Sequence, residues 1–316
     1  MPPKPIPEPR VAGSTQTTAV PLAWMEYGPA LPPPLVVLHG GPGADHRYLL
    51  PQMLRLAAQH DLLFYDQRGG GASTGTAASD GAPVTWRTQV DDLGAIVHER
   101  LGDARPTIIG YSWGGLLALL YLIESTRGSG TALTPPDRLV LIAPAPTTRA
   151  ERARFEAEFA RRQAAAAGPR ATLTESGLRG RDPAAYAQRA FELSVSGYFA
   201  DPARAHDLTP FRIVGRTQSS VWTSLDAYDL YPALETLAAA GRVPPALVVH
   251  GRQDPIPLAA SERLARTIGA TLVVLEDCGH VPYVEQPDAL FGAIETFLAA
   301  TGAGSATPVG AAGGTA

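Results

Sequence analysis

The strongest chemical signal in this chain is a turn sequence, GYSWG at residues 110–114. It has the G-x-S-x-G spacing, follows an apolar run at 107–109 and precedes a helix-like run. A serine at such a strand-to-helix turn has strained backbone angles, and the flanking glycines let neighbouring segments approach closely. The same five letters also occur in ordinary glycine-rich turns, so the context carries the interpretation. We predict that Ser112 is a nucleophile held above a sheet.

A serine hydroxyl becomes an effective nucleophile only when a nearby base takes its proton, which calls for a histidine. Of the seven histidines, His280 lies between the last strand-like run and the final helix-like run. That position places it at the same sheet edge as Ser112. His39 and His250 also end apolar runs, but glycine follows each of them, and we expect both to be structural. The other four are expected at the surface or in packing.

The histidine in turn needs an acid that holds its tautomer and stabilises the imidazolium. Asp254 follows the apolar run 246–249 and precedes His280 by 26 residues, so the chain order is serine, acid, histidine. The alternative role for Asp254 is to cap the helix expected from about residue 258. No carboxylate closely follows the run 139–142 to compete for the role. We predict a catalytic set of Ser112, Asp254 and His280.

Acyl transfer also needs donors for the developing oxyanion. The sequence HGGPG at residues 39–43 follows an apolar run, and we predict the amides of Gly41 and Trp113 as the two donors. These glycines do not form a phosphate loop, because no Lys-Ser or Lys-Thr follows them. The GGG at residues 69–71 lacks the dinucleotide-binding spacing. No Cys/His grouping has zinc-site spacing. The sequence therefore predicts no cofactor and no metal.

Short apolar runs and longer helix-like runs alternate along most of the chain, which predicts a mostly parallel sheet covered by helices. The strand-like runs are residues 35–38, 62–65, 107–109, 139–142, 246–249 and 271–275. The helix-like runs are 87–101, 114–125, 258–268 and 287–299. Residues 17–27, rich in β-formers, are expected to add antiparallel edge strands. The fold class that this order and the serine turn indicate is the α/β-hydrolase fold.

The alternation stops in a stretch where apolar residues recur at helical spacing. We predict a catalytic domain of residues 16–146 and 243–300, a helical cap of residues 147–242, and disordered tails at 1–15 and 301–316. The cap is rich in aromatic residues, most of which we expect in packing and the rest in an apolar roof. The notable ones are Phe191, Tyr198, Phe199, Phe211, Trp222, Tyr228 and Tyr231.

Composition narrows the partners and the location. The chain has 316 residues, 45% of them hydrophobic, 18% charged, and a net charge of -4. Because no Lys/Arg run stands out, nucleic acid is disfavoured as a partner. No stretch approaches the roughly 18 apolar residues that a membrane span needs. Cys278 is the lone cysteine and cannot form an internal disulfide, so we expect a reducing, cytoplasmic setting. The oligomeric state stays open.

Several motifs together resemble the proline iminopeptidases, aminopeptidases of the α/β-hydrolase superfamily that include the tricorn-associated peptidases. The motifs are HGGPG at 39–43, DQRG at 66–69, SWGG at 112–115, GRQD at 251–254 and Gly279-His280. The likeness spans the catalytic domain. It implies a fold and an activity of that family, with Asp66 and Arg68 bracing the oxyanion loop rather than touching substrate.

The chain departs from that family where the substrate's free amino group is held. Members use acidic residues, one near the catalytic aspartate and another in the cap. Here Pro255 follows Asp254, and residues 216–222 carry no acid. The acids that could substitute are Glu192, Asp226 and Asp229, and Trp222 is a further candidate for contact with substrate.

The leading hypothesis from the sequence is thus a serine hydrolase working through an acyl-enzyme, an aminopeptidase that releases an amino-terminal small apolar residue. Its substrate would be a small molecule or short peptide. The alternative is an esterase or amidase with the same machinery. A non-catalytic ligand-binding protein on this scaffold is disfavoured by the intact serine, acid and histidine. Epoxide hydrolases and haloalkane dehalogenases use a carboxylate nucleophile, whereas position 112 is serine.

Overall fold

A twisted sheet of eight strands lies at the centre of the computed structural model, which describes residues 6–74, 84–127 and 133–302. The spatial order is β1-β2-β4-β3-β5-β6-β7-β8. β2 is antiparallel to both of its neighbours, and all other neighbours are parallel. The strands are β1 (Val11–Ser14), β2 (Ala23–Tyr27), β3 (Leu35–Leu38), β4 (Leu62–Tyr65), β5 (Thr107–Tyr111), β6 (Arg138–Ile142), β7 (Ala246–Gly251) and β8 (Thr271–Leu275).

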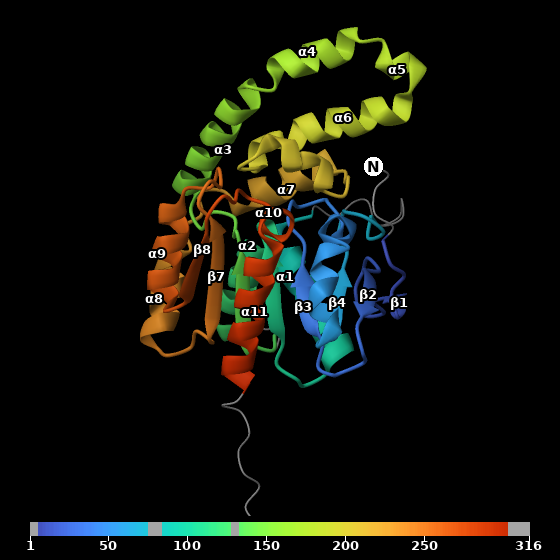
Figure 1. Ribbon diagram of the computed structural model, residues 1–316. Helices are drawn as coiled ribbons and strands as arrows, with labels where there is room; N and C mark the ends of the chain where they lie inside the picture. The colour runs from blue at the N-terminus through green and yellow to red at the C-terminus, as the bar shows by residue number, and fades with distance from the viewer. Residues whose placement is uncertain (1–5, 75–83, 128–132, 303–316) are drawn as a thin grey trace, which may run out of the picture.

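Helices cover both faces of the sheet, and each face has its own apolar core (Figure 1). One face packs on α1 (Trp86–Leu101), α2 (Trp113–Arg127), α8 (Tyr231–Ala239) and α9 (Leu258–Ile268). The other packs on the short helices η1 (His46–Leu49), η2 (Gln52–Ala58) and α10 (Pro282–Glu285), and on α11 (Pro287–Gly302). Alternate residues of β3 point to opposite cores, as strand geometry requires: Val36 and Leu38 to the first, Leu35 and Val37 to the second. The strands are therefore apolar throughout.

Between β6 and β7 the chain leaves the sheet and forms a helical segment, residues 147–242, most of which arches over the carboxyl ends of the parallel strands (Figure 1), while its last helix returns to the face of the sheet that α2 and α9 cover. It contains α3 (Arg149–Ala164), α4 (Ala167–Glu175), α5 (Leu178–Arg181), α6 (Pro183–Val195), η4 (Ser196–Tyr198), η5 (Pro202–Asp207) and α7 (Gly215–Leu225), and it ends with α8. The outer part has a small core of its own, formed by Ala166, Leu173 and Leu193. This segment supplies one side of the candidate site.

The predicted α/β-hydrolase architecture is confirmed, but the amino-terminal expectation needs a correction. Residues 11–14, expected in a disordered tail, form β1 and pair with β2. Arg10 anchors this edge, because its guanidinium bonds the carboxylates of Glu26 and Asp61. Of the edge strands expected within 17–27, only β2 lies there. The tail prediction for 1–5 and 303–316 falls outside the described residues, and α11 extends through 302.

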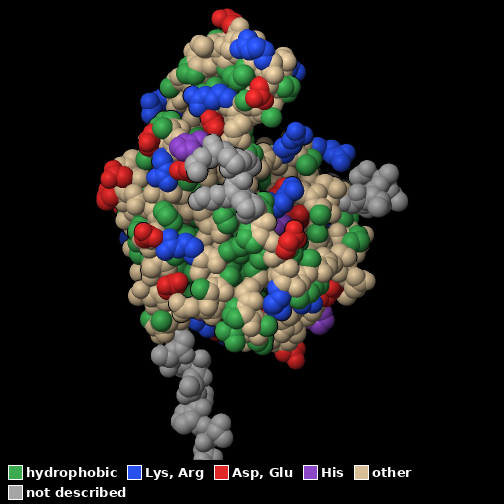
Figure 2. All heavy atoms as spheres, turned by 45° about the vertical axis from the view of Figure 1, so that its right-hand side comes forward, with side chains coloured by type: hydrophobic (Ala, Val, Ile, Leu, Met, Phe, Trp, Pro, Cys, Tyr) green, Lys and Arg blue, Asp and Glu red, His purple; other side chains and the backbone are tan. Residues whose placement is uncertain are grey.

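Charged side chains of both signs are scattered over the face shown in Figure 2, with no broad region of a single sign. This distribution agrees with the small net charge of -4 and offers, on that face, no extended basic surface for a phosphate backbone. Within the described residues, no helix combines the length and the apolar character needed to cross a membrane.

Candidate active site

Ser112 occupies a tight turn between β5 and α2. Its φ of 52° lies in the left-handed region, which is strained for a residue with a side chain. The glycines on either side are needed because backbone passes close to them. A Cβ on Gly110 would lie 2.4 Å from the carbonyl oxygen of Gly114, and one on Gly114 would lie 2.3 Å from that of Leu38. The turn therefore projects the Ser112 hydroxyl from the carboxyl edge of the sheet.

The three residues predicted to act together are in hydrogen-bond contact. Ser112 Oγ lies 2.9 Å from His280 Nε2, and His280 Nδ1 lies 2.9 Å from Asp254 Oδ2. The other Asp254 oxygen accepts the Ile256 amide at 2.7 Å. The Asp254 carboxylate is fully buried and requires a donor from the imidazole, so Nδ1 carries the hydrogen and Nε2 is left to accept the serine proton. A serine hydroxyl acts as a nucleophile when a base in this position takes its proton.

The backbone of His280 is bonded on both sides. Its amide donates to the carbonyl of Tyr198 at 2.7 Å, and its carbonyl accepts the Tyr111 hydroxyl at 3.0 Å. The Tyr198 ring also stacks on the imidazole, with centroids 5.1 Å apart. Burial, and then the charge of Asp254, raise the pKa of Tyr198 to about 12, so its phenol stays neutral. The helical segment thus holds His280 in place.

The glycine-rich loop after β3 lies directly against Ser112. A Cβ on Gly40 would lie 2.8 Å from Ser112 Cβ, and the Gly40 amide donates to the Tyr48 hydroxyl at 2.6 Å. The next residue, Gly41, has a φ of 55° and lines the same cavity as Ser112. Trp113 is the first residue of α2, whose first amides have no acceptor within the helix. The amides predicted as oxyanion donors therefore belong to the two segments that border Ser112.

A buried polar cluster supports this loop. Asp66, at the end of β4, accepts from the His46 ring at 2.8 Å and from the Ala72 amide at 2.8 Å. Burial acts to raise the pKa of Asp66, but the hydrogen bond from the His46 ring, together with the nearby imidazoles and the Ala72 amide, outweighs it and lowers that pKa. Asp45 completes a possible metal-ligand group, with ligand atoms within 4.8 Å, yet its carboxylate already binds Arg47. The hydrogen bonds of Asp66 and Asp45 are thus made within the protein, and they support the loop structurally.

Arg68 makes an ion pair with the buried Asp92 on α1 and does not line the Ser112 cavity.

The two histidines expected to be structural, His39 and His250, are buried and hydrogen-bonded. His39 Nε2 accepts the Gln67 amide, and His250 bonds the Ile256 carbonyl and the Ser261 hydroxyl. Burial lowers the pKa of both imidazoles, so they stay neutral at pH 7.

A cavity of about 330 Å³ opens beside Ser112 and His280. Its walls come from the loop after β3, from α3 and α6, and from residues 208–218. Apolar and aromatic side chains dominate: Tyr48, Tyr111, Phe159, Phe191, Val195, Tyr198, Leu208, Phe211, Ile213 and Val281. Among the described residues that line it there is no Asp, Glu, Lys or Arg. The cavity is suited to an uncharged group.

The residues singled out in the sequence for contact with substrate lie elsewhere. Glu192 pairs with Arg189 at 2.8 Å and faces a different cavity. Asp226 is exposed at the end of α7, and exposed Asp229 accepts the Tyr231 amide. Trp222 packs on Trp113, with ring centroids 5.1 Å apart, away from the cavity lining. None of the four lines the cavity beside Ser112.

Of the aromatic residues noted in the sequence, Phe191, Tyr198 and Phe211 line the cavity. Tyr228 and Tyr231 are buried in packing, as expected for most of the set. Three aromatic lining residues, Tyr48, Tyr111 and Phe159, were not among those noted in the sequence. The sequence did contain a signal for Phe159, because its spacing of four residues from Phe155 places both rings on one face of a helix. In the structure, the Phe155 ring lies near the His280 ring and the Phe159 ring stacks on the Tyr198 ring.

The parallel sheet, the strained serine turn at its carboxyl edge and the helical segment above it define a class of α/β proteins. A sequence model of the alpha/beta hydrolase family matches residues 35–293, and the chain belongs to that family. Family membership supports a hydrolase.

Relatives of assigned activity match a smaller part of the chain. Proline iminopeptidase from Lactobacillus helveticus is 40% identical over 97 residues, which is 29% of this chain and 31% of that protein. The enzyme of the same name from Saccharolobus solfataricus is 34% identical over 90 residues, 28% of each chain. The match therefore spans less than a third of these relatives.

Solved structures agree on the fold. A thermophilic esterase from Thermogutta terrifontis superposes with a TM-score of 0.61 at 22% identity, covering 92% of this chain and 99% of that one. An esterase from a Rhodococcus species gives a TM-score of 0.62 at 19% identity, with 92% and 99% covered. At these identities the likeness concerns the fold alone.

Proposed function

We propose that the protein is a serine hydrolase that acts through an acyl-enzyme on uncharged substrates with a small apolar acyl group. The observation that supports this most is the continuous hydrogen-bonded series from Ser112 Oγ through His280 to the buried Asp254. A cofactor is not needed for such chemistry.

In the proposed reaction, His280 Nε2 takes the Ser112 proton while Oγ attacks the substrate carbonyl carbon. The carbonyl oxygen becomes an oxyanion, which the amides of Gly41 and Trp113 stabilise. Asp254 stabilises the imidazolium that forms. The imidazolium then protonates the leaving alcohol or amine, and the acyl group stays on Ser112. Water, activated by the same histidine, releases the acid and restores the serine.

The cavity lining favours an ester or a neutral amide over a free amino terminus. A substrate ammonium loses its water shell when it enters the cavity, and without a carboxylate partner that loss is uncompensated. The described lining has no acid to serve as that partner. We therefore place the carboxylesterase or amidase first.

The aminopeptidase of the proline iminopeptidase type is the second candidate, and the sequence similarity to enzymes of that name favours it. An apolar cavity of about 330 Å³ would also accept a proline ring. The two candidates differ in one respect that can be measured: whether a free amine on the acyl group helps or hinders.

The helical segment 147–242 is proposed to act as a cap on a catalytic domain of residues 16–146 and 243–300. The contacts of Phe159, Phe191 and Tyr198 with the cavity support this division. A reducing, cytoplasmic setting remains our proposal for location, supported by the lone, buried Cys278. Small molecules or short peptides remain the proposed substrates.

The deciding experiment compares kcat/KM for prolyl and alanyl naphthylamides with their N-acetylated twins, alongside short nitrophenyl esters, with the Ser112→Ala variant as blank. We expect the free-amine to acetylated ratio to fall below one and the esters to be turned over. A ratio well above ten would instead establish the aminopeptidase. If none of these substrates were hydrolysed, both candidates would be overturned.

A further inference from the structure

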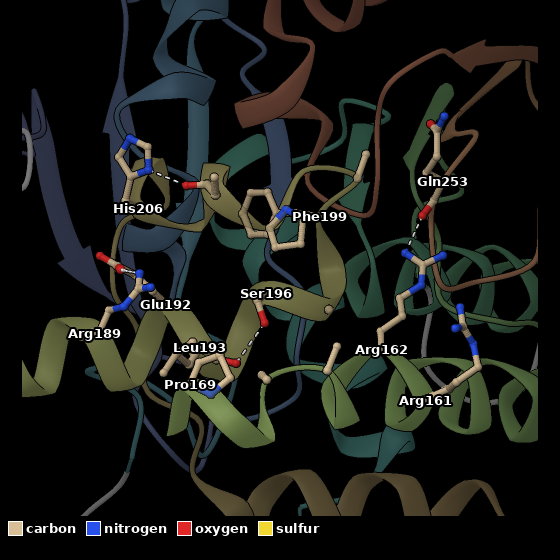
Figure 3. Close-up of a pocket in the computed structure, with 16 residues that line it drawn as sticks. Arg161, Arg162, Pro169, Arg189, Glu192, Leu193, Ser196, Phe199, His206 and Gln253 are labelled. Atoms are coloured by element: carbon tan, nitrogen blue, oxygen red, sulfur yellow. Dashed lines mark hydrogen bonds and ion pairs between the residues drawn. The ribbon is translucent and has the colours of Figure 1, made fainter. Parts of the chain in front are cut away.

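A second and larger cavity, of about 770 Å³, lies in the helical segment between α3 and the α6–η5 region (Figure 3). Helix α6 separates it from the Ser112 cavity. Phe191, Ser194 and Val195 of α6 line the Ser112 cavity, whereas Arg189, Glu192 and Leu193 line the second one. Its volume is within the range of ligand sites in proteins, roughly 300–1,000 Å³. The proposed hydrolysis makes no use of it.

Charged groups lie at the two ends of this cavity, with apolar side chains between them. Figure 3 shows Arg161 and Arg162 at one end and Arg189 with Glu192 at the other. Leu193, Pro169 and Phe199 lie in the middle, and small residues such as Ala165 and Ala166 add to the apolar wall. Such a site matches a molecule with an apolar body and a charged end.

The two ends differ in charge balance. Arg189 and Glu192 pair with each other at 2.8 Å, and His206 at the same end lies 3.2 Å from the carboxylate of Asp207, so each group that can be positive there has its own carboxylate. At the other end, Arg161 and Arg162 share a single carboxylate, Glu158. Hydrogen bonds from these two arginines lower the pKa of Glu158 to about 2, so it is ionised at pH 7. Two positive charges on one negative charge leave an excess of one.

The end of the cavity at Arg161 and Arg162 also has guanidinium N–H donors beyond those used in the hydrogen bonds described next. A guanidinium has five N–H donors. Arg161 uses two on Glu158, while Arg162 uses one on Glu158 and one on the Gln253 carbonyl at 2.6 Å. The Arg162 side chain is 23% exposed and the Arg161 side chain 72%, which places Arg162 inside and Arg161 at the rim. A monoanionic headgroup would satisfy both the charge and the donors.

We propose that this cavity binds a monoanionic amphiphile, a medium-chain carboxylate, with its carboxylate at Arg161 and Arg162 and its chain over Pro169, Leu193 and Phe199. A single negative charge is favoured because the excess positive charge is one. A second carboxylate at the far end would meet Glu192. The site is independent of the chemistry at Ser112.

Binding is tested by titration calorimetry on the Ser112→Ala protein, in which turnover is absent, so that the result does not depend on the proposed function. The ligands are decanoate, decanol and decyltrimethylammonium, which share chain length and differ in headgroup. We expect saturable binding of decanoate with a Kd at least about tenfold below that of decanol, and weaker binding still for the cation. No saturable binding of decanoate, or equal affinity for decanoate and decanol, would overturn the proposal.

Two variants locate the site. The double change Arg161→Gln with Arg162→Gln should weaken decanoate binding about tenfold or more, whereas exposed Arg154→Gln on the same helix should not change it. Ala165→Phe, an exposed lining position, should obstruct the cavity, whereas neighbouring exposed Ala164→Phe, outside the lining, should leave binding intact. Decanoate binding that survives both site variants would place the ligand elsewhere, for example beside Ser112, and would overturn the proposal.

Discussion

His280 is the side chain on which the contacts of the candidate site converge. Its two ring nitrogens bond Ser112 and Asp254, and its amide bonds the carbonyl of Tyr198. The imidazole is 5% exposed, so water does not compete for these bonds. The proposed proton transfer from Ser112 requires that the His280 hydrogen lie on Nδ1, where the buried Asp254 carboxylate accepts it.

Ser112→Ala is expected to lower kcat/KM by about 10³-fold or more, because the nucleophile is lost while the rest of the site remains. The turn should survive, since its bonds are made by backbone: the Ser112 amide donates to Ile142 and its carbonyl accepts from Ala145. Steady-state kinetics and a thermal melt check both points. Ser125→Ala, on helix α2 that follows the Ser112 turn, is the matched control. A Ser112→Ala enzyme with more than a tenth of the original activity would contradict the mechanism.

Asp66 gives a prediction about pH. The pKa of Asp66 is lowered in the folded protein, so its charged form stabilises the fold at any pH above 3.8, the ordinary pKa of an aspartate. This stabilisation is lost as the pH falls from 3.8 through the lower pKa of the folded state. Asp66→Asn should cost about 1–3 kcal/mol near neutral pH. The difference from wild type should shrink below about pH 4.

Urea unfolding of both proteins at several pH values measures this, with exposed Asp103→Asn as control. A difference that is unchanged down to the most acid pH would show that the carboxylate charge has no part in the stabilisation.

At the scale of elements, the close approach of α2 to the end of β3 positions Ser112. Gly114 makes this approach possible, because a Cβ there would lie 2.3 Å from the Leu38 carbonyl oxygen and 2.8 Å from that of His39. Neither atom can move without disturbing the strand end or the loop that carries Gly41.

Gly114→Ala is therefore expected to lower the free energy of unfolding by more than about 2 kcal/mol. Gly292, in the middle of α11, has open space where a Cβ would lie, with no heavy atom of another segment within 4 Å, so Gly292→Ala should be neutral or stabilising by up to about 1 kcal/mol. Denaturant unfolding of the two variants separates a steric effect at α2 from a general effect of alanine in a helix. Equal stability of the two would contradict the steric argument.

At the scale of the whole molecule, Glu285 joins the helical segment to the loop that carries His280. Its two carboxylate oxygens accept the amides of Ala200 at 2.7 Å and Gly279 at 2.8 Å. Burial raises the pKa of Glu285, and the amide hydrogen bonds limit the rise. One carboxylate therefore holds two parts of the chain that are far apart in sequence.

Glu285→Gln keeps the shape but leaves one oxygen for two amides, so one donor loses its acceptor. We expect faster hydrogen exchange at residues 200 and 279 and a drop in kcat/KM of about tenfold, because His280 is held less firmly. Exposed Glu276→Gln is the control. Unchanged exchange at both amides would show that Glu285 does not make this connection.

The sequence by itself determined the parallel strands of the sheet and the candidate triad, because apolar runs and the residues that follow them can be read locally. β3, β4, β8 and α9 have the bounds expected from apolar runs and helical spacing. Ser112, Asp254 and His280 were found because parallel strands present their carboxyl ends at one edge, so residues that follow strands meet there.

Only the tertiary structure decided which side chains face the cavity beside Ser112. On α6, Phe191 and Val195 face Ser112 while Glu192 faces the second cavity, a difference set by how the helix is rotated against the sheet. Helical spacing shows which residues share a face but not what that face meets. The same holds for β1, a run of Val, Ala, Gly and Ser that is exposed throughout, lacks the apolar run of a buried strand, and depends for its position on pairing with β2. Long-range packing settles such choices, and local sequence does not contain it.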